Sequence, residues 1–379
     1  MADRALANPP RRRIILTRSS PAVHESRLRN ELRMFREAGY DVAVYCWDRR
    51  AEHPKHEEQD GTWIHRCRAP GSYASKTLFF SMPLWWLCEF FYLLFHRAHG
   101  IHACDFDTVV PALLVKWIKR TKVVFDVYDF YAARTRTLPR FLRSVFERAE
   151  QFCARRADAV IIVDESRKYL LGRASPRRLV TAVNCPYDGV NSDWKKPERN
   201  ELVIFYGGLI ARFRGIRKLI RLTEDLERVR VIIAGPIKDE SYRKLLEDAP
   251  HVEYLGHLDP RDVTLHTFNA DAVYSYYDPA LEINRTANST KMFEAFMCST
   301  AVLCNAEPPS TQVVSENHCG MRLPYDDDER LRETILQWRD HPEIPREFGR
   351  NGRRLFESRY DWRRVSEAIL QVYREMGLG

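Results

Sequence analysis

The chain has 379 residues and a formal net charge of +8, placed unevenly: residues 1–200 hold 35 Lys and Arg against 23 Asp and Glu, and residues 201–379 hold 25 against 29. This length predicts two domains, each large enough to bury its own core. Nine cysteines with no C-x-x-C pair argue against a disulfide framework or a zinc site, and the start lacks the apolar segment of a signal peptide, so we expect a cytoplasmic chain with reduced thiols.

Short β-rich apolar runs alternate with segments of helical period along the whole chain. This alternation predicts α/β domains, in which parallel strands are covered by helices on both faces. Each half is expected to form its own Rossmann-like, doubly wound domain. The expected strands are residues 13–17, 41–47, 122–125 and 159–163 in the first half, and 202–206, 229–234, 251–255, 272–276 and 301–305 in the second.

The first strand leads into a predicted helix. Ser19 and Ser20 are candidate N-caps, Pro21 is expected in the first turn, and Gly39 is expected to end the helix. This opening lacks the G-x-G-x-x-G loop of dinucleotide-binding proteins. Residues 187–200 have the proline, glycine and mixed charge of a linker. We therefore expect an N-terminal domain over 1–197 and a C-terminal domain over 198–358.

Residues 78–95 break the alternating pattern, because 15 of the 18 are apolar and eight are aromatic. A membrane span is disfavoured, because it would separate strands that belong to one sheet and would bury Glu89 in lipid. A buried packing helix and a helix lying in one leaflet both remain open. Nearby Lys116, Lys119, Arg140 and Arg143 favour a membrane-associating helix at about 77–97. The basic half suits an anionic membrane or nucleic acid, and charge alone does not decide between them.

A glycine and arginine loop follows the strand at residues 202–206. Gly207 and Gly208 allow a ligand to approach the backbone, and Arg212 and Arg214 are suited to phosphate at the carboxyl end of a strand.

A second polar motif lies about 75 residues further on. Asn288 or Ser289 can cap a helix whose N-terminus attracts an anion, and Thr290 and Lys291 fall in its first turn. Glu294, one turn later, can accept hydrogen bonds from a ribose. Together the two motifs predict a pocket for a nucleoside diphosphate.

The order of these motifs resembles family 4 glycosyltransferases, which have the GT-B fold, over nearly the whole chain. The resemblance is carried by Phe205-Tyr206-Gly207-Gly208-Leu209 with Arg214-Gly215, Val252-Glu253-Tyr254-Leu255-Gly256, Ala270-Asp271-Ala272-Val273, Ser289-Thr290-Lys291-Met292-Phe293-Glu294-Ala295, Ile101-His102-Ala103-Cys104-Asp105, Val123-Val124-Phe125-Asp126-Val127-Tyr128-Asp129 and Ala157-Asp158-Ala159-Val160. Trp362 and the following helix resemble the family's closing helix, so residues 359–379 are expected to return to the first domain.

The resemblance implies a GT-B architecture with a cleft between two Rossmann-like domains, and transfer of a sugar from a nucleotide donor with retention. The family's usual Arg is Gly208 here, and its usual Lys is Arg214. The first acid of its E-x7-E pattern falls on Thr286, for which Glu282 is a possible substitute. Tyr128 stands where many members have a histidine.

The expected donor site comprises Gly207, Gly208, Arg212, Arg214, Ser289, Thr290, Lys291 and Glu294. Arg214 and Lys291 would stabilise the leaving phosphate, Tyr128 and Asp129 would act at the reacting carbon, and Asp126 or Asp129 would serve as base if the reaction inverts. We expect no metal and no other cofactor, because Asp105 and Asp107 imitate a D-x-D motif in a place where the family binds no metal.

The function that these patterns favour is hexose transfer from a UDP- or GDP-sugar to a lipid-linked or surface-glycan acceptor, at the inner face of the cytoplasmic membrane and without nucleic acid. An epimerase or phosphorylase of the same fold is a second hypothesis, and a non-catalytic nucleic-acid-binding protein is a third.

Overall fold

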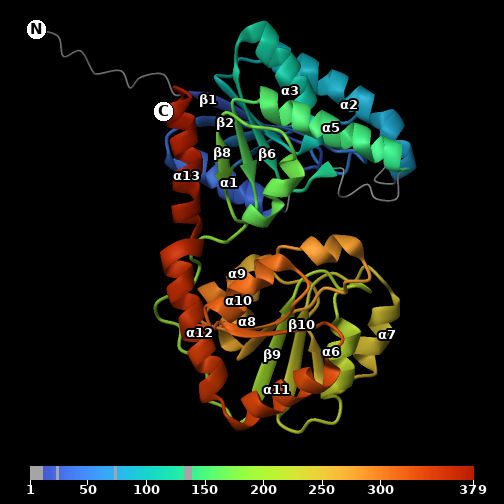
Figure 1. Cartoon of the computed structure of the whole chain (residues 1–379), viewed down its shortest axis with the longest axis vertical. Helices are drawn as coiled ribbons and strands as arrows, with labels where there is room; N and C mark the ends of the chain where they lie inside the picture. Colours follow the sequence, from blue (N-terminus) through green and yellow to red (C-terminus); the bar gives the residue numbers. More distant parts are fainter. Residues whose placement is uncertain (1–11, 23–24, 72–74, 132–138) are drawn as a thin grey trace, which may run out of the picture. The chain divides into compact units, whose positions relative to one another are not determined.

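The structure is a computed structural model that describes residues 12–22, 25–71, 75–131 and 139–379, without the side chains of residues 75–80 and 283. Its contacts divide the chain into unit 1, Met1–Val183 with Val365–Gly379, and unit 2, Asn184–Arg364. Each unit is a mainly parallel sheet covered by helices, which confirms the predicted α/β class (Figure 1).

Unit 1 holds an eight-stranded sheet in the order β3-β4-β2-β1-β5-β6-β7-β8, parallel except for β3 at one edge. The strands are β1 (Arg13–Arg18), β2 (Asp41–Trp47), β3 (His56–Gln59), β4 (Thr62–Cys67), β5 (Gly100–Cys104), β6 (Lys122–Val127), β7 (Ala159–Ile162) and β8 (Leu179–Thr181). The helices are α1 (Ser26–Glu37), α2 (Ser75–Phe95), α3 (Phe106–Lys119), α5 (Arg140–Arg156), the 3₁₀ segment η1 (Glu165–Leu171) and α13 (Trp362–Glu375), which belongs to unit 1 from Val365 onward.

The helices of unit 1 form a layer on each face of this sheet. On one face α2, α3 and α5 lie side by side, and their inner residues join those of the sheet in one hydrophobic core (Figure 1). On the other face α1 and α13 meet through Phe35 and Tyr373, whose ring centroids are 4.9 Å apart. The Tyr373 hydroxyl also lies 2.8 Å from Nδ1 of the buried His102 on β5, so the C-terminal helix is bound to the sheet by a buried polar contact.

The helix after β1 begins later than predicted. Glu25 is the N-cap of α1, and Ser19 and Ser20 form a bend after β1 instead of capping a helix. Their hydroxyls are taken by acidic side chains, because Ser19 donates to Asp107 and Ser20 donates to Glu25. The predicted stop is correct, since Gly39 has a φ of +84° directly after the C-cap.

The aromatic helix α2 has two different faces. Trp85 and Glu89 are fully buried, and the Trp85 indole donates to the carbonyl of Asp107 at 2.8 Å. Leu87 and Phe95 on the opposite face are 55% and 78% exposed. Among the helices of the described residues, none has the length and hydropathy needed to cross a membrane. The helix thus packs on the sheet and still presents apolar side chains outward.

Unit 2 holds a six-stranded, all-parallel sheet in the order β11-β10-β9-β12-β13-β14. The strands are β9 (Leu202–Gly207), β10 (Val229–Ala234), β11 (Val252–Tyr254), β12 (Ala272–Ser275), β13 (Ala301–Asn305) and β14 (Gly320–Leu323). The helices are α6 (Ile216–Thr223), α7 (Ser241–Glu247), α8 (Pro260–Asn269), α9 (Thr290–Met297), α10 (Gln312–Glu316), α11 (Asp328–Asp340) and α12 (Glu343–Leu355), with short segments η2 (Glu282–Thr286), η3 (Pro309–Thr311) and η4 (Phe356–Tyr360).

This strand order places the first strand of unit 2, β9, directly beside its fourth, β12. Crossovers leave β9 toward β10 on one side, and the chain later returns on the other side through β12. In doubly wound sheets the ligand crevice opens at such a switch point, beyond the carboxyl ends of the two strands. The segments that matter for ligand binding are therefore those after Gly207 and after Ser275.

Candidate active site

The backbone at Gly208 makes room for the main cation of the site. Gly208 follows β9 with a φ of +148°, and a Cβ placed on it would lie 2.8 Å from Cε and 3.1 Å from Nζ of Lys291. A side chain at position 208 would therefore displace the Lys291 ammonium. The arginine that the family resemblance leads one to expect at position 208 is absent, and the ammonium of Lys291 from α9 lies beside the glycine instead.

Lys291 is half-buried against two tyrosine rings. Its Nζ lies 3.5 Å from the hydroxyl of Tyr277, 5.1 Å from the ring centroid of Tyr206 and 5.5 Å from that of Tyr277. Burial lowers the pKa of Lys291, but the phenolic oxygens of Tyr277 and Tyr206 outweigh it, and the net shift is upward. The ammonium therefore stays charged at neutral pH.

Tyr277 lies at the centre of the cluster and was not predicted from the sequence. Its hydroxyl donates to Ser289 Oγ at 3.1 Å, and the Arg214 guanidinium lies 4.7 Å from its ring centroid. Burial would raise its pKa, yet Lys291 and Arg214 lower it below the usual value. The run of three tyrosines and one serine at the end of a strand, residues 274–277, is the pattern that could have pointed to it.

The N-terminus of α9 faces this cluster. Ser289 is the N-cap residue, as predicted, but its side chain makes no capping hydrogen bond. Its Oγ accepts instead from Ser275 at 2.7 Å and from Tyr277. The Met292 N–H donates to the Ser289 carbonyl at 3.3 Å, whereas the N–H groups of Thr290 and Lys291 keep their capacity to bind an anion. The helix dipole adds to the field of Lys291 and Arg214.

Glu294 lies one turn beyond Lys291 and is half-buried. Burial raises its pKa above the usual range, and Lys291 only partly offsets that shift. Among the described residues its carboxylate has no hydrogen-bond partner. It is therefore an acceptor available to a ligand. Thr290, also predicted, is the first residue of the helix and half-buried.

Arg212 stands apart from this cluster. It is exposed, and its guanidinium lies 5.5 Å from the ring centroid of Phe213. Its positive charge contributes to lowering the pKa of Asp239 and offsets part of the rise in the pKa of Tyr242. The structure thus brings together Gly208, Arg214, Ser289 and Lys291, with Glu294 one helical turn away, and leaves Arg212 to the side.

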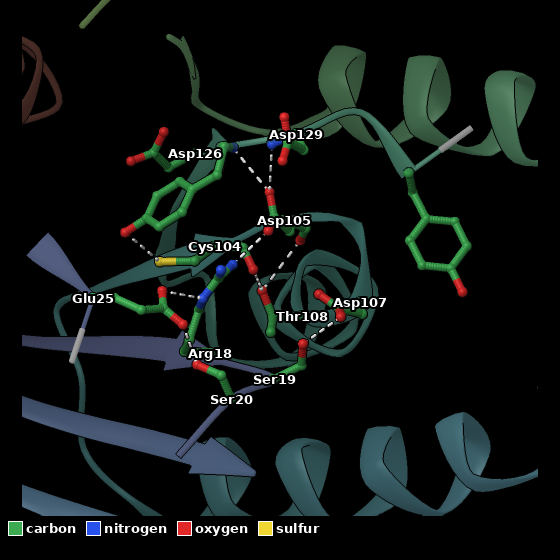
Figure 2. Close-up of polar contacts among 12 residues, drawn as sticks. Arg18, Ser19, Ser20, Glu25, Cys104, Asp105, Asp107, Thr108, Asp126 and Asp129 are labelled. Carbon is green, nitrogen blue, oxygen red and sulfur yellow. Dashed lines mark hydrogen bonds and ion pairs between the residues drawn. The ribbon is translucent and has the colours of Figure 1, made fainter. Parts of the chain in front are cut away.

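Tyr128 and Asp129 lie in unit 1, after β6, where Asp105 organises their backbone (Figure 2). Asp105 Oδ1 accepts from the N–H groups of Tyr128 and Asp129 at 2.8 and 3.1 Å, while its other oxygen pairs with Arg18. The Tyr128 ring lies beneath the Arg18 and Arg27 guanidinium groups, and its hydroxyl donates to Glu31 at 2.8 Å. The Asp129 carboxylate is partly exposed and pairs with Arg167 at 2.9 Å.

Asp126, the other candidate base, is fully buried and pairs with Arg27 at 2.8 Å and with His102 at 3.2 Å. Burial would raise its pKa, but Arg27 and then His102 hold it well below the usual value. Such a carboxylate is a structural ion-pair partner with no access to a substrate. Asp129 is therefore the better placed acid of the two.

Two groups of side chains in unit 1 have the residue types of a metal site. The Asp105 and Asp107 carboxylates are buried and accept from neighbouring protein groups, with Ser19 donating to Asp107 (Figure 2). Glu31, His102 and Cys104 have ligand atoms within 4.8 Å of one another. Glu31 is already bonded to Tyr128 and Arg27, and His102 lies between Asp126 and Tyr373. The second group is therefore better explained as a buried polar network.

Residues 24–185 match the family described as Glycosyl transferase 4-like domain, and residues 214–371 match the one described as Glycosyl transferase-like. The chain is a family 4 glycosyltransferase. The two matches cover most of each unit of the glycosyltransferase. They argue against a non-catalytic nucleic-acid-binding protein, which the basic charge of the first half left open.

Solved structures share the GT-B fold of this glycosyltransferase. Sucrose-phosphate synthase from Thermosynechococcus elongatus is 16% identical with a TM-score of 0.73, over 97% of this chain and 99% of that one. HepE from Anabaena, solved with UDP, is 14% identical with a TM-score of 0.69, over 96% of this chain and all of that one. The predicted GT-B architecture is thereby confirmed.

A curated relative, alpha-maltose-1-phosphate synthase of Mycolicibacterium smegmatis, is 24% identical to the glycosyltransferase over 198 residues. The match spans 47% of this chain and about half, 49%, of that protein.

Proposed function

We propose that this glycosyltransferase moves a hexose from a UDP- or GDP-linked sugar to a lipid-linked or surface-glycan acceptor, with retention at the anomeric carbon. The observation that carries the donor half is the convergence of Arg214 and Lys291 on Tyr277, in front of the N-terminus of α9. Among the described residues neither cation forms an ion pair. This cluster thus keeps a positive charge that a diphosphate would neutralise.

In the proposed reaction the bond between the anomeric carbon and the β-phosphate oxygen breaks as the sugar gains oxocarbenium character. Negative charge then develops on the leaving nucleoside diphosphate, and Lys291, Arg214 and the α9 N–H groups stabilise it. Because these groups are already in place, little reorganisation is needed during the reaction.

Retention is proposed to follow from attack on the face that the phosphate leaves. The acceptor oxygen bonds to the anomeric carbon, and its proton passes to an oxygen of the departing phosphate. Tyr128 and Asp129 are assigned to the sugar and acceptor side. Asp129 would take the proton only if the reaction inverts.

The nucleoside is proposed to be held through its ribose by the carboxylate of Glu294, with Gly207, Gly208, Ser289 and Thr290 lining the phosphate path. HepE, a structural neighbour, is solved with UDP and with UDP-glucose. This supports UDP-sugars as the first donors to test. No metal or other cofactor is assigned, because lysine, arginine and a helix N-terminus supply the positive charge.

The acceptor and location are proposed from unit 1. The outward apolar face of α2 and the basic excess of the first half support a protein held peripherally at the inner face of the cytoplasmic membrane. A lipid-linked acceptor would be presented at that surface.

A thermal-shift scan of nucleotide-sugars tests this function directly, because a ligand that binds only the folded state raises its melting temperature. We expect one UDP- or GDP-hexose to stabilise the wild type and to do so less in Lys291→Ala. Mass spectrometry of the product formed on membrane extracts then identifies the acceptor. Equal, negligible shifts for all nucleotide-sugars would refute the proposal.

A further inference from the structure

The exposed apolar side chains of the molecule gather on one layer of unit 1. Fourteen large hydrophobic side chains are exposed among the described residues, and ten of them lie on α2, α3 and α5. These ten are Leu84, Leu87, Phe91, Phe95, Leu114, Trp117, Ile118, Phe141, Val145 and Phe152. Surface apolar residues are normally scattered singly, so this concentration calls for a partner.

On each helix these residues recur at helical spacing. On α2 they are three or four residues apart. On α3, Trp117 and Ile118 follow Leu114 by three and four residues, and on α5, Val145 follows Phe141 by four. Residues at such spacing share one side of a helix. The helix α3 packs against both α2 and α5 (Figure 1). Side chains of all three helices line one groove, so we treat the three stripes as one surface, hereafter the three-helix face.

A groove opens in the three-helix face. It has a volume of about 360 Å³ and is lined by apolar side chains and one thiol: Trp86, Phe106, Val110, Leu113, Leu114, Trp117, Ala149, Phe152 and Cys153. Leu114, Trp117 and Phe152 are exposed at its mouth. The indole N–H of Trp86 is taken by the Asp107 carbonyl at 3.0 Å, so Trp86 offers only ring carbons. This volume falls within the range of pockets that hold small ligands.

The charges beside this surface are mainly positive. Arg148, Arg155 and Arg156 of α5 are exposed, and the Arg156 guanidinium lies 5.3 Å from the ring of Phe152. The acids Glu89, Asp107 and Glu150 on the same three helices are buried, whereas Glu147 is exposed. A basic, apolar surface fits the headgroup and acyl boundary of an anionic bilayer.

We propose that the three-helix face seats on an anionic phospholipid leaflet and that its groove takes one acyl chain of a membrane lipid. Charge favours a membrane over a second copy of this chain. In a symmetric dimer the arginines of one copy would face the same arginines of the other, and like charges repel. This inference rests on the proposed function, because the membrane contact would serve to bring the enzyme to a lipid-linked acceptor. It extends the membrane contact from α2 alone to three helices and a chain site.

Co-sedimentation of the full chain with vesicles of phosphatidylcholine, with or without phosphatidylglycerol, tests the face. Trp117→Glu should lower partitioning roughly tenfold, the effect of losing one large apolar side chain from the interface. Trp63→Glu is the matched control, since Trp63 is exposed to a similar degree on β4. Arg148→Glu should lower partitioning roughly fivefold or more, only with phosphatidylglycerol. Arg29→Glu, exposed on α1 of the opposite layer, is its control.

Filling the groove tests the chain site separately. Ala149→Phe places a ring in the cavity and leaves the surface apolar, so it should reduce the quenching of tryptophan fluorescence by vesicles with brominated acyl chains. Unchanged quenching in Ala149→Phe would overturn the chain site. If Trp117→Glu partitions onto vesicles as strongly as the wild type, the docking face is overturned. It is also overturned if light scattering shows that the wild type is a dimer and that Trp117→Glu is a monomer.

UDP-glucose and GDP-mannose binding, measured by calorimetry on the same proteins, separates this inference from the proposed function. If vesicles bind, and neither these two donors nor any nucleotide-sugar of the thermal-shift scan binds, the function is refuted and the docking face stands. If a nucleotide-sugar binds and vesicles do not, only the docking face is refuted.

Discussion

The ammonium of Lys291 lies 3.5 Å from the phenolic oxygen of Tyr277, and each side chain shifts the pKa of the other. Burial lowers the pKa of Lys291 and raises that of Tyr277, yet both net shifts run the opposite way. The mutual attraction of ammonium and phenolate, aided by Arg214 at the tyrosine, thus exceeds the effect of burial at both groups. The site favours negative charge at the position of the Tyr277 hydroxyl, which is the property a phosphate-binding pocket needs.

Removing either cation should slow transfer without unfolding the protein. Arg214→Ala or Lys291→Ala is expected to lower kcat/KM by roughly 10²–10³, by analogy with the loss of one preorganised charge-stabilising donor. Arg214→Lys should recover much of this loss, because a point charge can serve one phosphate. In the double variant the loss should be smaller than the sum if both act on one oxygen. The measurement is steady-state kinetics. Values of kcat/KM near wild type in both Arg214→Ala and Lys291→Ala would show that neither residue takes part in the mechanism.

Gly208→Ala should weaken donor binding by moving Lys291, since the new Cβ would lie 2.8 Å from the Lys291 Cε. We expect a clear rise in the donor Kd by calorimetry. Gly256→Ala is the control for an alanine at positive φ: its φ of +70° lies in the left-handed region, which is less strained than the +148° of Gly208, and its Cβ would meet nothing within 4 Å. Equal donor binding in the two variants would show that strain, and not the lysine contact, accounts for any effect.

Glu294→Gln should have opposite effects on stability and on donor binding. The pKa of Glu294 is raised in the folded state, so its contribution to stability is present in acid and lost as pH rises through that pKa. Glutamine should therefore raise Tm at neutral pH, and the difference should shrink on acidification. Donor binding should weaken by about 1.5–3 kcal/mol, the range for a hydrogen bond to a charged group.

The pH dependence of donor affinity gives a second measurement of the same carboxylate. Wild-type affinity should fall as pH drops through the Glu294 pKa, and the Gln variant should lack this fall. A donor affinity that is unchanged by the substitution at neutral pH would exclude Glu294 from the ribose site.

Catalysis should survive chelation by EDTA, because the positive charge of the proposed donor site comes from side chains and a helix terminus. Asp105→Ala should instead destabilise unit 1, by about 3–5 kcal/mol, the cost of breaking a buried pair from one side. Asp105 accepts hydrogen bonds from two backbone N–H groups and pairs with Arg18, so its loss should lower the Tm. Activity that vanishes with EDTA and returns with Mg²⁺ or Mn²⁺ would contradict the metal-free mechanism.

The class of fold could be predicted from the sequence because buried parallel strands leave a strong local mark. The apolar runs of β1, β2, β9 and β13 are continuous, since both faces of these strands are covered. Edge strands lack this mark: β3 is the polar run His-Glu-Glu-Gln, and it becomes a strand only by pairing with β4. The start of α1 differs from the prediction because Ser19 and Ser20, which could cap a helix, bond to acidic side chains instead.

Local sequence by itself also predicted most of the residues of the proposed donor site. Gly208, Arg214, Lys291 and Glu294 fall where backbone approach, charge and a helix start have recognisable residue types. Only the tertiary structure decided that Lys291 fills the space beside Gly208, 83 positions away along the chain, and that Tyr277 lies between the two cations. It likewise decided which side of α2 is buried and joined its outer stripe to those of α3 and α5. The physical reason is strand order: β9 and β12 become neighbours through a sheet whose pairing no local pattern encodes.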